Sequence, residues 1–415
     1  MARPSVRIYR LTVFAIILSL LLAACGSDPT PTATSAPTAT PTTAKQPGTT
    51  PVATSSQPTA TPTAASSTPR FDALVAKAKA EAAQNNTVTG WYESIDPAVI
   101  RAWEQEFQKE YGFAIKVATI PGHSARDAPV QALAGFKANK AIADSQTGNV
   151  DSIITLAEAG GLMKPDWAAL YEGLPIYKVQ HQAVPVETVL NTGEPLSAYC
   201  AVGSFYVWPF TYNTNAVTKQ EIAAGISYDD LATNPKWKNR VLTDNRFLGV
   251  YFFPLAPGWS EERQKTWVKA LKANGAKGIA GGSTGLIQAL LSGEGDIAIA
   301  SGGFDEKAKG APIDILVPKD GWITGGLGMS CTPKLVTTGG TNLAQLWNAW
   351  RHTRGNEVMQ VVTKSPVTVP GISNDYTKLL ANAGIRIPQD LVMARTLAEF
   401  NSIGKWRQDA IDAFK

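Results

Sequence analysis

Short apolar strands alternate with amphipathic helices from residue 71 onward, and this alternation constrains the fold more than any other feature. Apolar side chains recur at helical spacing over 71–84 and again over 97–111. Runs rich in β-branched and aromatic residues follow at 87–92 and 113–120. A strand–helix–strand rhythm of this kind is typical of a parallel sheet covered by helices. The sequence therefore predicts an α/β fold for the body of the chain.

Further elements are expected along the rest of the body. Asp96 is placed to cap the second helix, with Pro97 at its first position and Gly112 after its end. The other expected elements are a helix over 128–143, strands at 151–156, 198–202, 205–212 and 240–243, helices over 260–273 and 284–291, strands at 296–301 and 313–317, and helices over 342–351 and 357–363, followed by amphipathic segments to 414.

The N-terminal residues have the pattern of a targeting segment. Arg3, Arg7 and Arg10 precede an apolar stretch over 11–24. As a helix that stretch would span only about 21 Å, too short for a hydrocarbon core of about 30 Å. The pattern predicts a cleaved signal peptide over 1–24, with a permanent N-terminal membrane helix as the alternative. Leu22-Ala23-Ala24-Cys25 resembles a bacterial lipobox, which would make Cys25 the site of lipidation.

Residues 26–69 are nearly all Pro, Thr, Ala and Ser, and they contain no Leu, Ile, Met, Phe, Tyr or Trp. Such a segment has no apolar surface to bury, so it cannot offset the entropy lost on ordering. We therefore expect residues 25–69 to be a lipid-anchored linker. This linker would hold the body outside the cytoplasm, close to the cell membrane.

Charge excludes some partners. The chain has 38 basic and 34 acidic residues, and setting aside the three arginines of the signal peptide leaves 35 basic residues. A nearly neutral body offers no general field for nucleic acid or for an anionic membrane surface. The hydrophobic fraction of 44% is ample for a buried core.

Cys200 and Cys331 remain once Cys25 is assigned to lipid, either as a disulfide or as two buried free thiols.

Four segments of the body carry a family resemblance. They are 74–81 (LVAKAKAE), 229–242 (DDLATNPKWKNRVL), 286–299 (LIQALLSGEGDIAI) and 316–321 (LVPKDG). In this order they resemble segments of the solute-binding proteins of bacterial ABC importers, in the branch that includes iron, thiamine and polyamine binders. The resemblance implies the two-lobe type II periplasmic-binding-protein fold, an α/β fold with two interdomain crossovers.

The resemblance also implies an organisation and a function. Lobe 1 would comprise 70–207 plus 325–415, and lobe 2 would comprise 208–324 with the hinge strands. A small solute would be captured between the lobes and delivered to an ABC permease by a monomeric protein that is not an enzyme and needs no cofactor. Both Cys200 and Cys331 would then lie on the lobe 1 side of the hinge, so we expect them to form a disulfide.

Aromatic residues near the expected cleft are the first candidate ligand contacts. Trp91, Tyr92 and Glu93 follow the first strand, where they could stack on a ring or face a cation. The alternative is that one of the two aromatic residues alternates into the core. Trp208 and Trp322 lie on the two crossovers and could close over a ligand or pack the hinge itself.

The loop after the strand at 296–301 departs from the family pattern. Ferric binders of this family carry a tyrosine pair there, whereas this chain has Gly303, Phe304 and Asp305. The departure predicts no ferric ion. No other metal is expected either, because His123, His181 and His352 lie far apart in the sequence and no H-x₃-H or C-x₂-C spacing occurs. Asp305 could face an amine or polyol, or simply cap a helix. Arg246 could clamp a carboxylate or phosphonate, or form a surface ion pair with Asp244.

Gly281-Gly-Ser-Thr-Gly285 matches the nucleophile-elbow pattern and raises an enzyme alternative, a surface serine hydrolase using Ser283. His352 is the only histidine downstream of Ser283. Ser283 could instead cap the helix over 284–291, and the open N–H groups of that helix could meet an anion. A structural or adhesive surface lipoprotein is the third interpretation. The identity of the ligand stays open between sugars, polyols, organic cations and anions.

Overall fold

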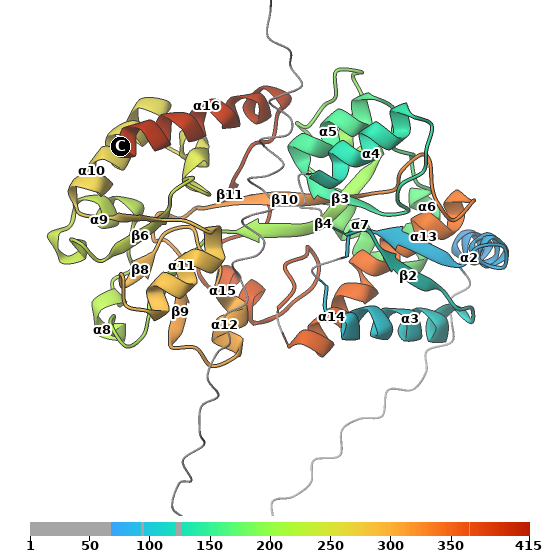
Figure 1. Cartoon of the computed structure of the whole chain (residues 1–415), viewed down its shortest axis with the longest axis horizontal. Helices are drawn as coiled ribbons and strands as arrows, with labels where there is room; N and C mark the ends of the chain where they lie inside the picture. The colour runs from blue at the N-terminus through green and yellow to red at the C-terminus, as the bar shows by residue number, and fades with distance from the viewer. Residues whose placement is uncertain (1–67, 93–94, 122–126, 365) are drawn as a thin grey trace, which may run out of the picture. The chain divides into compact units, whose positions relative to one another are not determined.

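The computed structural model describes residues 68–415 except 93–94, 122–126 and 365, and it leaves the side chain of Asp305 undescribed. The expectations for the signal peptide over 1–24, for Cys25 and for nearly all of the linker over 25–69 lie outside the described residues. The body has two α/β lobes, and no sheet of the described residues is shared between them (Figure 1). Among the helices in the described part of the chain, none has the length and apolar character that a membrane crossing requires.

Lobe 1 is built on two sheets. Its strands are β1 (Thr87–Gly90), β2 (Lys116–Thr119), β3 (Gln146–Asn149), β4 (Cys200–Val207), β10 (Ile323–Cys331) and β11 (Leu391–Val392). β1 and β2 run parallel, while β10 pairs antiparallel with both β3 and β4 and parallel with β11. Its helices are α2 (Pro69–Ala82), α3 (Pro97–Tyr111), α4 (Asp127–Lys137), α5 (Val150–Glu158), α6 (Trp167–Gly173), α7 (Pro175–Gln182), η1 (Leu196–Ala198), α13 (Thr341–His352), α14 (Arg354–Thr363) and α15 (Asp375–Asn382).

Lobe 2 is built on one five-stranded sheet with the order β7-β6-β8-β5-β9. Its strands are β5 (Phe210–Asn213), β6 (Val241–Asp244), β7 (Lys277–Ile279), β8 (Ile297–Ala298) and β9 (Ile313–Leu316). β6 runs parallel to β7 and β8, and β5 runs antiparallel to β8 and β9. The helices in this stretch are α8 (Lys219–Ile222), α9 (Tyr228–Thr233), η2 (Pro235–Trp237), η3 (Val250–Leu255), α10 (Glu261–Ala273), α11 (Gly282–Leu291) and α12 (Phe304–Ala308).

Local sequence explains many of these boundaries. The Asp96 carboxylate accepts a hydrogen bond from the backbone N–H of Ala98 at 2.7 Å, and Gly112 ends α3 in the left-handed conformation, as the sequence predicts. The apolar face of α3 places Trp103 and Phe107 fully inside the lobe 1 core. The amphipathic pattern of a helix therefore predicted both its limits and its buried face.

Several predicted elements were wrong or misplaced. The strand predicted at 151–156 is helix α5, and the strand at this point is the more polar β3 just before it. The buried residues Val150, Ile153, Ile154 and Ala157 have helical spacing, which a short apolar run does not reveal on its own. The helix predicted over 128–143 ends at Lys137. The strands predicted at 198–202 and 205–212 were divided at the wrong place: β4 runs without a break from Cys200 to Val207, and β5 begins at Phe210.

The chain passes between the two sheets where the sequence predicts. β4 pairs within lobe 1 and β5 within lobe 2, and the return runs from β9 to β10. The C-terminal helix α16 (Leu397–Phe414) is a correction, because 325–415 was assigned wholly to lobe 1. Instead α16 lies along α10, with Trp406 Nε1 donating to Glu261 at 2.9 Å (Figure 1). Trp406 and Ala410 are buried in the lobe 2 core, since the amphipathic helix covers an apolar surface there.

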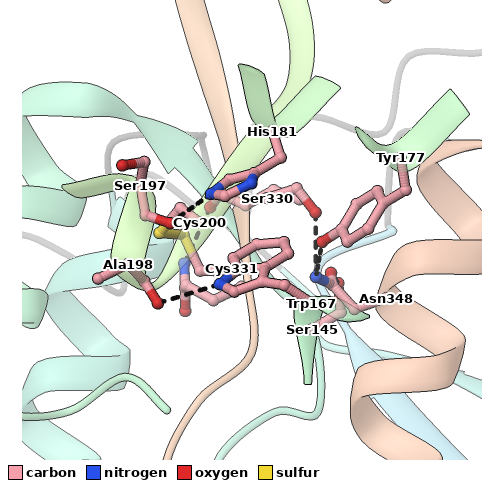
Figure 2. Close-up of a disulfide and its surroundings, with 12 residues drawn as sticks. Ser145, Trp167, Tyr177, His181, Ser197, Ala198, Cys200, Ser330, Cys331 and Asn348 are labelled. Carbon is pink, nitrogen blue, oxygen red and sulfur yellow. Dashed lines mark hydrogen bonds between the residues drawn. A yellow bond between two sulfur atoms is a disulfide. The ribbon is translucent and has the colours of Figure 1, made fainter. Parts of the chain in front are cut away.

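A disulfide joins β4 to β10 inside lobe 1. Cys200 and Cys331 face each other across the antiparallel pair with their Cα atoms 4.4 Å apart, so the predicted bond is confirmed. Both cysteines are fully buried. Figure 2 shows polar groups beside the bond: Ser145 Oγ donates to Asn348 Oδ1 at 2.7 Å, and Asn348 Nδ2 donates to Ser330 Oγ at 3.0 Å. The bond therefore ties together two segments of lobe 1 that lie 131 residues apart.

Candidate functional site

Two hollows meet at the end of β4, where the chain leaves lobe 1. We call the first the hinge hollow, with a volume of about 390 Å³, and the second the α16 hollow, with a volume of about 340 Å³. Tyr206 and Trp208 line both. Residues two apart on an extended strand share a face, which explains why both aromatic side chains line the same hollows. Hollows of this size lie within the range for small-molecule sites.

The hinge hollow draws residues from both lobes. Its lining residues are Phe205, Tyr206, Val207, Trp208, Ser283, Thr284, Ile287, Gly302, Gly303, Phe304, Glu306, Pro366, Thr368 and Tyr376. Lobe 2 contributes the beginnings of α11 and α12, and lobe 1 contributes the segment before α15. The end of β4 supplies further lining residues, so a solute here would contact both lobes and the hinge.

Glycines bring the lobe 2 backbone close to the hinge hollow. Gly303 has a φ of +104°, and a Cβ there would lie 2.9 Å from Ile287 Cδ1. Gly282 has a φ of +65°, and its Cβ would lie 2.6 Å from Arg246 Nη2. Residues with side chains rarely adopt these angles, so glycine is required at both turns. The turns place the N–H groups at the start of α11 beside Ser283 and Thr284, a favourable position for an anion or hydroxyl.

Trp208 forms a rigid wall. Its backbone N–H donates to the Thr324 carbonyl at 3.0 Å, which fixes the first crossover against the second. Its ring stacks on Phe252 with centroids 6.0 Å apart and planes at 21°. The side chain is half-buried, so part of it remains accessible to a ligand.

Phe304 and Tyr376 also line the hinge hollow, and their ring centroids are 3.6 Å apart. The Tyr376 hydroxyl donates to the Val207 carbonyl at 3.4 Å. Burial raises the pKa of this phenol well above its usual value, so it is neutral and acts as a hydrogen-bond donor. Phe304 is thus held by lobe 1 as well as by its own helix.

Glu306 is the only acidic residue among the described lining residues of the hinge hollow. Its carboxylate makes no hydrogen bond or ion pair with any residue in the described ranges. Within those same ranges no three His, Cys, Asp or Glu side chains gather as a metal site would require. The described site is therefore a polar and aromatic groove with hydroxyl and backbone donors.

Three predicted residues come together in the hinge hollow: Trp208, Ser283 and Phe304. Glu93 lies outside the described residues, and the side chain of Asp305 does too, so neither candidate is placed. Trp91 is half-buried and packs against the lobe 1 core.

Tyr92 is a correction. Its side chain is 3% exposed, and its hydroxyl accepts a hydrogen bond from Trp347 Nε1 at 2.9 Å. Its ring packs edge-on against Trp103 at 5.8 Å. Successive side chains of an extended segment point to opposite sides, and Tyr92 takes the side that faces the core.

Trp322 is a second correction. Although it lies on a crossover, it is 6% exposed and stacks on Tyr228 with centroids 4.7 Å apart and planes at 16°. Phe253 packs edge-on against the same ring at 5.5 Å. Trp322 therefore packs the lobe 2 core rather than the cleft, which was the alternative for a hinge aromatic.

Arg246 forms the ion pair with Asp244 that was the alternative to a ligand clamp. Its Nε donates to Asp244 Oδ1 at 3.0 Å and its Nη2 donates to Asp244 Oδ2 at 3.1 Å. The Asp244 side chain is fully buried, whereas that of Arg246 is 60% exposed. The guanidinium thus neutralises a buried carboxylate and stands beside the turn at Gly282 rather than free in the hollow.

The hydrolase alternative finds no support. His352 is 4% exposed inside lobe 1, with Nδ1 donating to the Gly203 carbonyl at 3.2 Å and Nε2 accepting from Arg351. Both ring nitrogens are occupied, so neither can serve Ser283 on lobe 2. Ser283 is not the helix cap either, because α11 begins earlier, after Gly281 in the left-handed conformation.

Sequence reasoning missed several lining residues. They are Tyr206, Thr284, Glu306, Thr368 and Tyr376. Tyr206 could have been found from its spacing of two from Trp208, and Thr284 from its place beside Ser283 at the glycine-rich turn. Thr368 and Tyr376 come from the C-terminal third, and no local signal links them to the cleft.

Comparison with known proteins gives the fold. No family model matches the chain. Iron uptake protein A1 of Synechocystis is 32% identical over 93 residues, which are 22% of this chain and 25% of that protein. This chain therefore spans about a quarter of the curated relative.

Solved structures match over most of the body. Iron-bound HitA from Pseudomonas aeruginosa has a TM-score of 0.53 at 16% identity, covering 79% of this chain and 99% of that one. Trichodesmium IdiA (FutA), solved with iron and citrate, has a TM-score of 0.55 at 16% identity, covering 79% and 98%. The substrate-binding protein of an ABC transporter from Agrobacterium tumefaciens has a TM-score of 0.51 at 16% identity, covering 79% and 96%. The chain has the two-lobe fold of the solute-binding proteins of ABC transporters.

Proposed function

We propose that the protein captures a small solute outside the cytoplasm and delivers it to the permease of an ABC importer. The observation that carries this proposal is the hinge hollow, which is lined by both lobes and by the strand that joins them. A solute that contacts both lobes favours a closed arrangement, and the two crossovers would serve as the hinge. This role needs recognition and release, with no chemistry by the chain itself.

The lobe division is part of the proposal. Lobe 1 would comprise 70–207 with 325–396, and lobe 2 would comprise 208–324 together with α16. The assignment of α16 to lobe 2 follows from its packing on α10. Closure would then move α16 together with α11 and α12.

The polar groups of the hinge hollow favour a solute that carries oxygen atoms. Ser283 and Thr284 supply hydroxyls at the start of α11, and the turn before them leaves backbone N–H groups directed outward. Trp208 and Phe304 supply aromatic surfaces in the same hollow. A small organic solute bearing a carboxylate, phosphonate or hydroxyl fits this combination.

Ferric ion is the solute of several similar proteins, but the described donors of this groove do not suit it. A hard trivalent cation prefers several anionic oxygens. Here Phe304 lies in the loop where the ferric binders of the family carry tyrosines, and Tyr376 is kept neutral by burial. We therefore expect the purified protein to stay colourless when ferric citrate is added. A visible phenolate-to-iron absorption band at stoichiometric iron would contradict this.

Location follows from the N-terminus. Cleavage before Cys25 and lipidation of its thiol would anchor the protein to the membrane, with 25–69 as a linker to a monomeric body. Cys25→Ala should abolish incorporation of a labelled fatty acid. Equal labelling of the variant and the wild type would exclude this anchor.

A ligand screen tests the function. Thermal shift against carboxylates, phosphonates, sugars, polyamines and metals should reveal at least one solute, since ligand at 100 times its Kd adds about 2.7 kcal/mol of stability. Thr284→Ala should weaken the binding of that solute. Gln288→Ala should leave binding unchanged, because Gln288 is exposed on the same helix and lies outside the hollow. A screen without any stabilising solute, or equal effects of both variants, would count against the hinge hollow.

A further inference from the structure

The α16 hollow is a second recess between the two lobes. It lies against β10 and brings together the start of α5 in lobe 1 with η3 and α16 of lobe 2. Its polar lining residues are Asn149, Asp151 and Arg407. It shares the lining residues Tyr206 and Trp208 with the hinge hollow.

Aromatic rings form one wall of the α16 hollow. Trp208 stacks on Phe252, and Phe252 lies 4.6 Å from Tyr251 with planes at 55°. Trp208 and Tyr251 meet edge to face at 6.4 Å. Tyr251 and Phe252 are buried and hold the half-buried Trp208 ring in place, so this ring is preformed and costs little entropy on binding a planar group.

Arg407 supplies a positive charge that lacks a partner. Its guanidinium lies over the Tyr251 ring, 4.7 Å from the centroid. Its Nε is buried without a hydrogen-bond acceptor, and no carboxylate in the described ranges pairs with it. Its neighbours on α16 differ, because Lys405 and Trp406 both contact Glu261. A buried donor without an acceptor is costly, so an incoming carboxylate would be favoured here.

Asp151 supplies the opposite charge from the other lobe. It lies in the first turn of α5 and is half-buried. Its carboxylate makes no ion pair or hydrogen bond with the residues that the structure describes. The helix start favours the negative charge itself, while its outward side remains free to accept from a cation. The hollow therefore presents one unpaired cation and one unpaired anion on facing lobes.

We propose that the α16 hollow binds an aromatic zwitterion of the α-amino-acid type. The carboxylate pairs with Arg407, the ammonium pairs with Asp151, and the ring packs against Trp208, which Tyr251 and Phe252 support. The ligand bridges the two lobes, because Arg407 lies on α16 of lobe 2 and Asp151 lies on α5 of lobe 1. This assignment rests on the proposed solute-binding function and gives the α16 hollow a ligand class of its own, beside the oxygen-bearing solute of the hinge hollow.

The test is isothermal titration with L-phenylalanine and three analogues that each lack one part. Phenethylamine lacks the carboxylate, 3-phenylpropionate lacks the ammonium and glycine lacks the ring. L-phenylalanine should bind, the two single-charge analogues more weakly, and glycine not measurably. Losing one charge-assisted contact should cost about tenfold or more in affinity.

Two variants separate the charges. Arg407→Gln should lower the affinity for L-phenylalanine and 3-phenylpropionate about tenfold and leave the affinity for phenethylamine unchanged. Asp151→Asn should lower the affinity for L-phenylalanine and phenethylamine about tenfold and leave that for 3-phenylpropionate unchanged. The controls are Arg101→Gln, an exposed arginine on α3, and Asp72→Asn, an acid in the first turn of α2. Neither control should alter any affinity.

Three outcomes would overturn the assignment. In the first, another solute stabilises the protein but L-phenylalanine and its analogues do not bind at millimolar concentration, which would leave the proposed function intact. In the second, no solute of any class binds, and both proposals fail. In the third, Arg407→Gln and Asp151→Asn lower the melting temperature of the unliganded protein equally and non-additively, with affinities unchanged. That result would identify a direct ion pair between the lobes instead of a ligand site.

Discussion

Lobe 1 and lobe 2 are held together by different interactions. The centre of lobe 1 contains the Cys200–Cys331 bond and buried polar groups, among them Ser330 and Asn348. The centre of lobe 2 is a cluster of aromatic rings around Trp322, and no cysteine occurs over 208–324. The difference follows the path of the chain. Lobe 1 is made of two segments separated by residues 208–324 of lobe 2, so its assembly closes a long loop, whereas most of lobe 2 is one continuous segment.

The largest expected effect breaks the covalent link of lobe 1. Cys200→Ser should lower the free energy of unfolding by about 4–5 kcal/mol in the chain-entropy model, because the bond closes a loop of 131 residues. Denaturant unfolding should show lobe 1 losing stability while the lobe 2 transition keeps its midpoint. Cys331→Ser is the matched control and should give the same loss. One shared, unshifted transition in all variants would show that the bond does not distinguish the lobes.

The next effect concerns the aromatic centre of lobe 2. Trp322→Ala should destabilise the protein by about 3–5 kcal/mol, because it leaves a cavity between Tyr228 and Phe253. The loss should be the same with and without reductant, since no disulfide lies in this core. Urea unfolding under both conditions measures this. A loss that disappears on reduction would mean that the two lobes unfold as one unit.

The sequence predicted the fold better than it predicted side-chain directions. The α/β alternation, the two crossovers and the disulfide are confirmed, because hydrophobic spacing and chain order determine them. The run at 151–156 was misassigned, since a short apolar stretch suits a strand or a helix equally. The packing of α16 depends on which apolar surface the rest of the chain leaves open, and that is a tertiary property.

The candidate site was only partly predictable for the same reason. Trp208, Ser283 and Phe304 were found from their places at crossovers and turns. Tyr92 and Trp322 had equally good positions in the sequence but point into cores. Tyr376 joins the site only because α15 packs beside β4, a contact between residues 169 positions apart.

Acid should weaken lobe 1 selectively. Burial and the adjacent Arg351 guanidinium hold the pKa of His352 well below its usual value of 6.5. The folded state therefore favours the neutral ring, and its stabilisation is complete above pH 6.5 and declines as the pH falls toward the lowered pKa. The slope should be about 1.4 kcal/mol per pH unit, or about 2 kcal/mol between pH 6.5 and 5. Unfolding measured across this range should lose that slope in His352→Gln.

The smallest expected effect on stability sharpens the contrast between the two crossover tryptophans. Trp208→Ala should cost about 1–2 kcal/mol, less than Trp322→Ala, because Trp208 is half-buried and water can enter the space that it leaves. Its effect on binding should be the larger of the two, since Trp208 lines both hollows while Trp322 lines neither. Melting temperature and ligand affinity, measured on both variants, separate these roles. If Trp322→Ala impaired binding more than Trp208→Ala at a temperature where both are folded, the cleft would have to be placed at the second crossover instead.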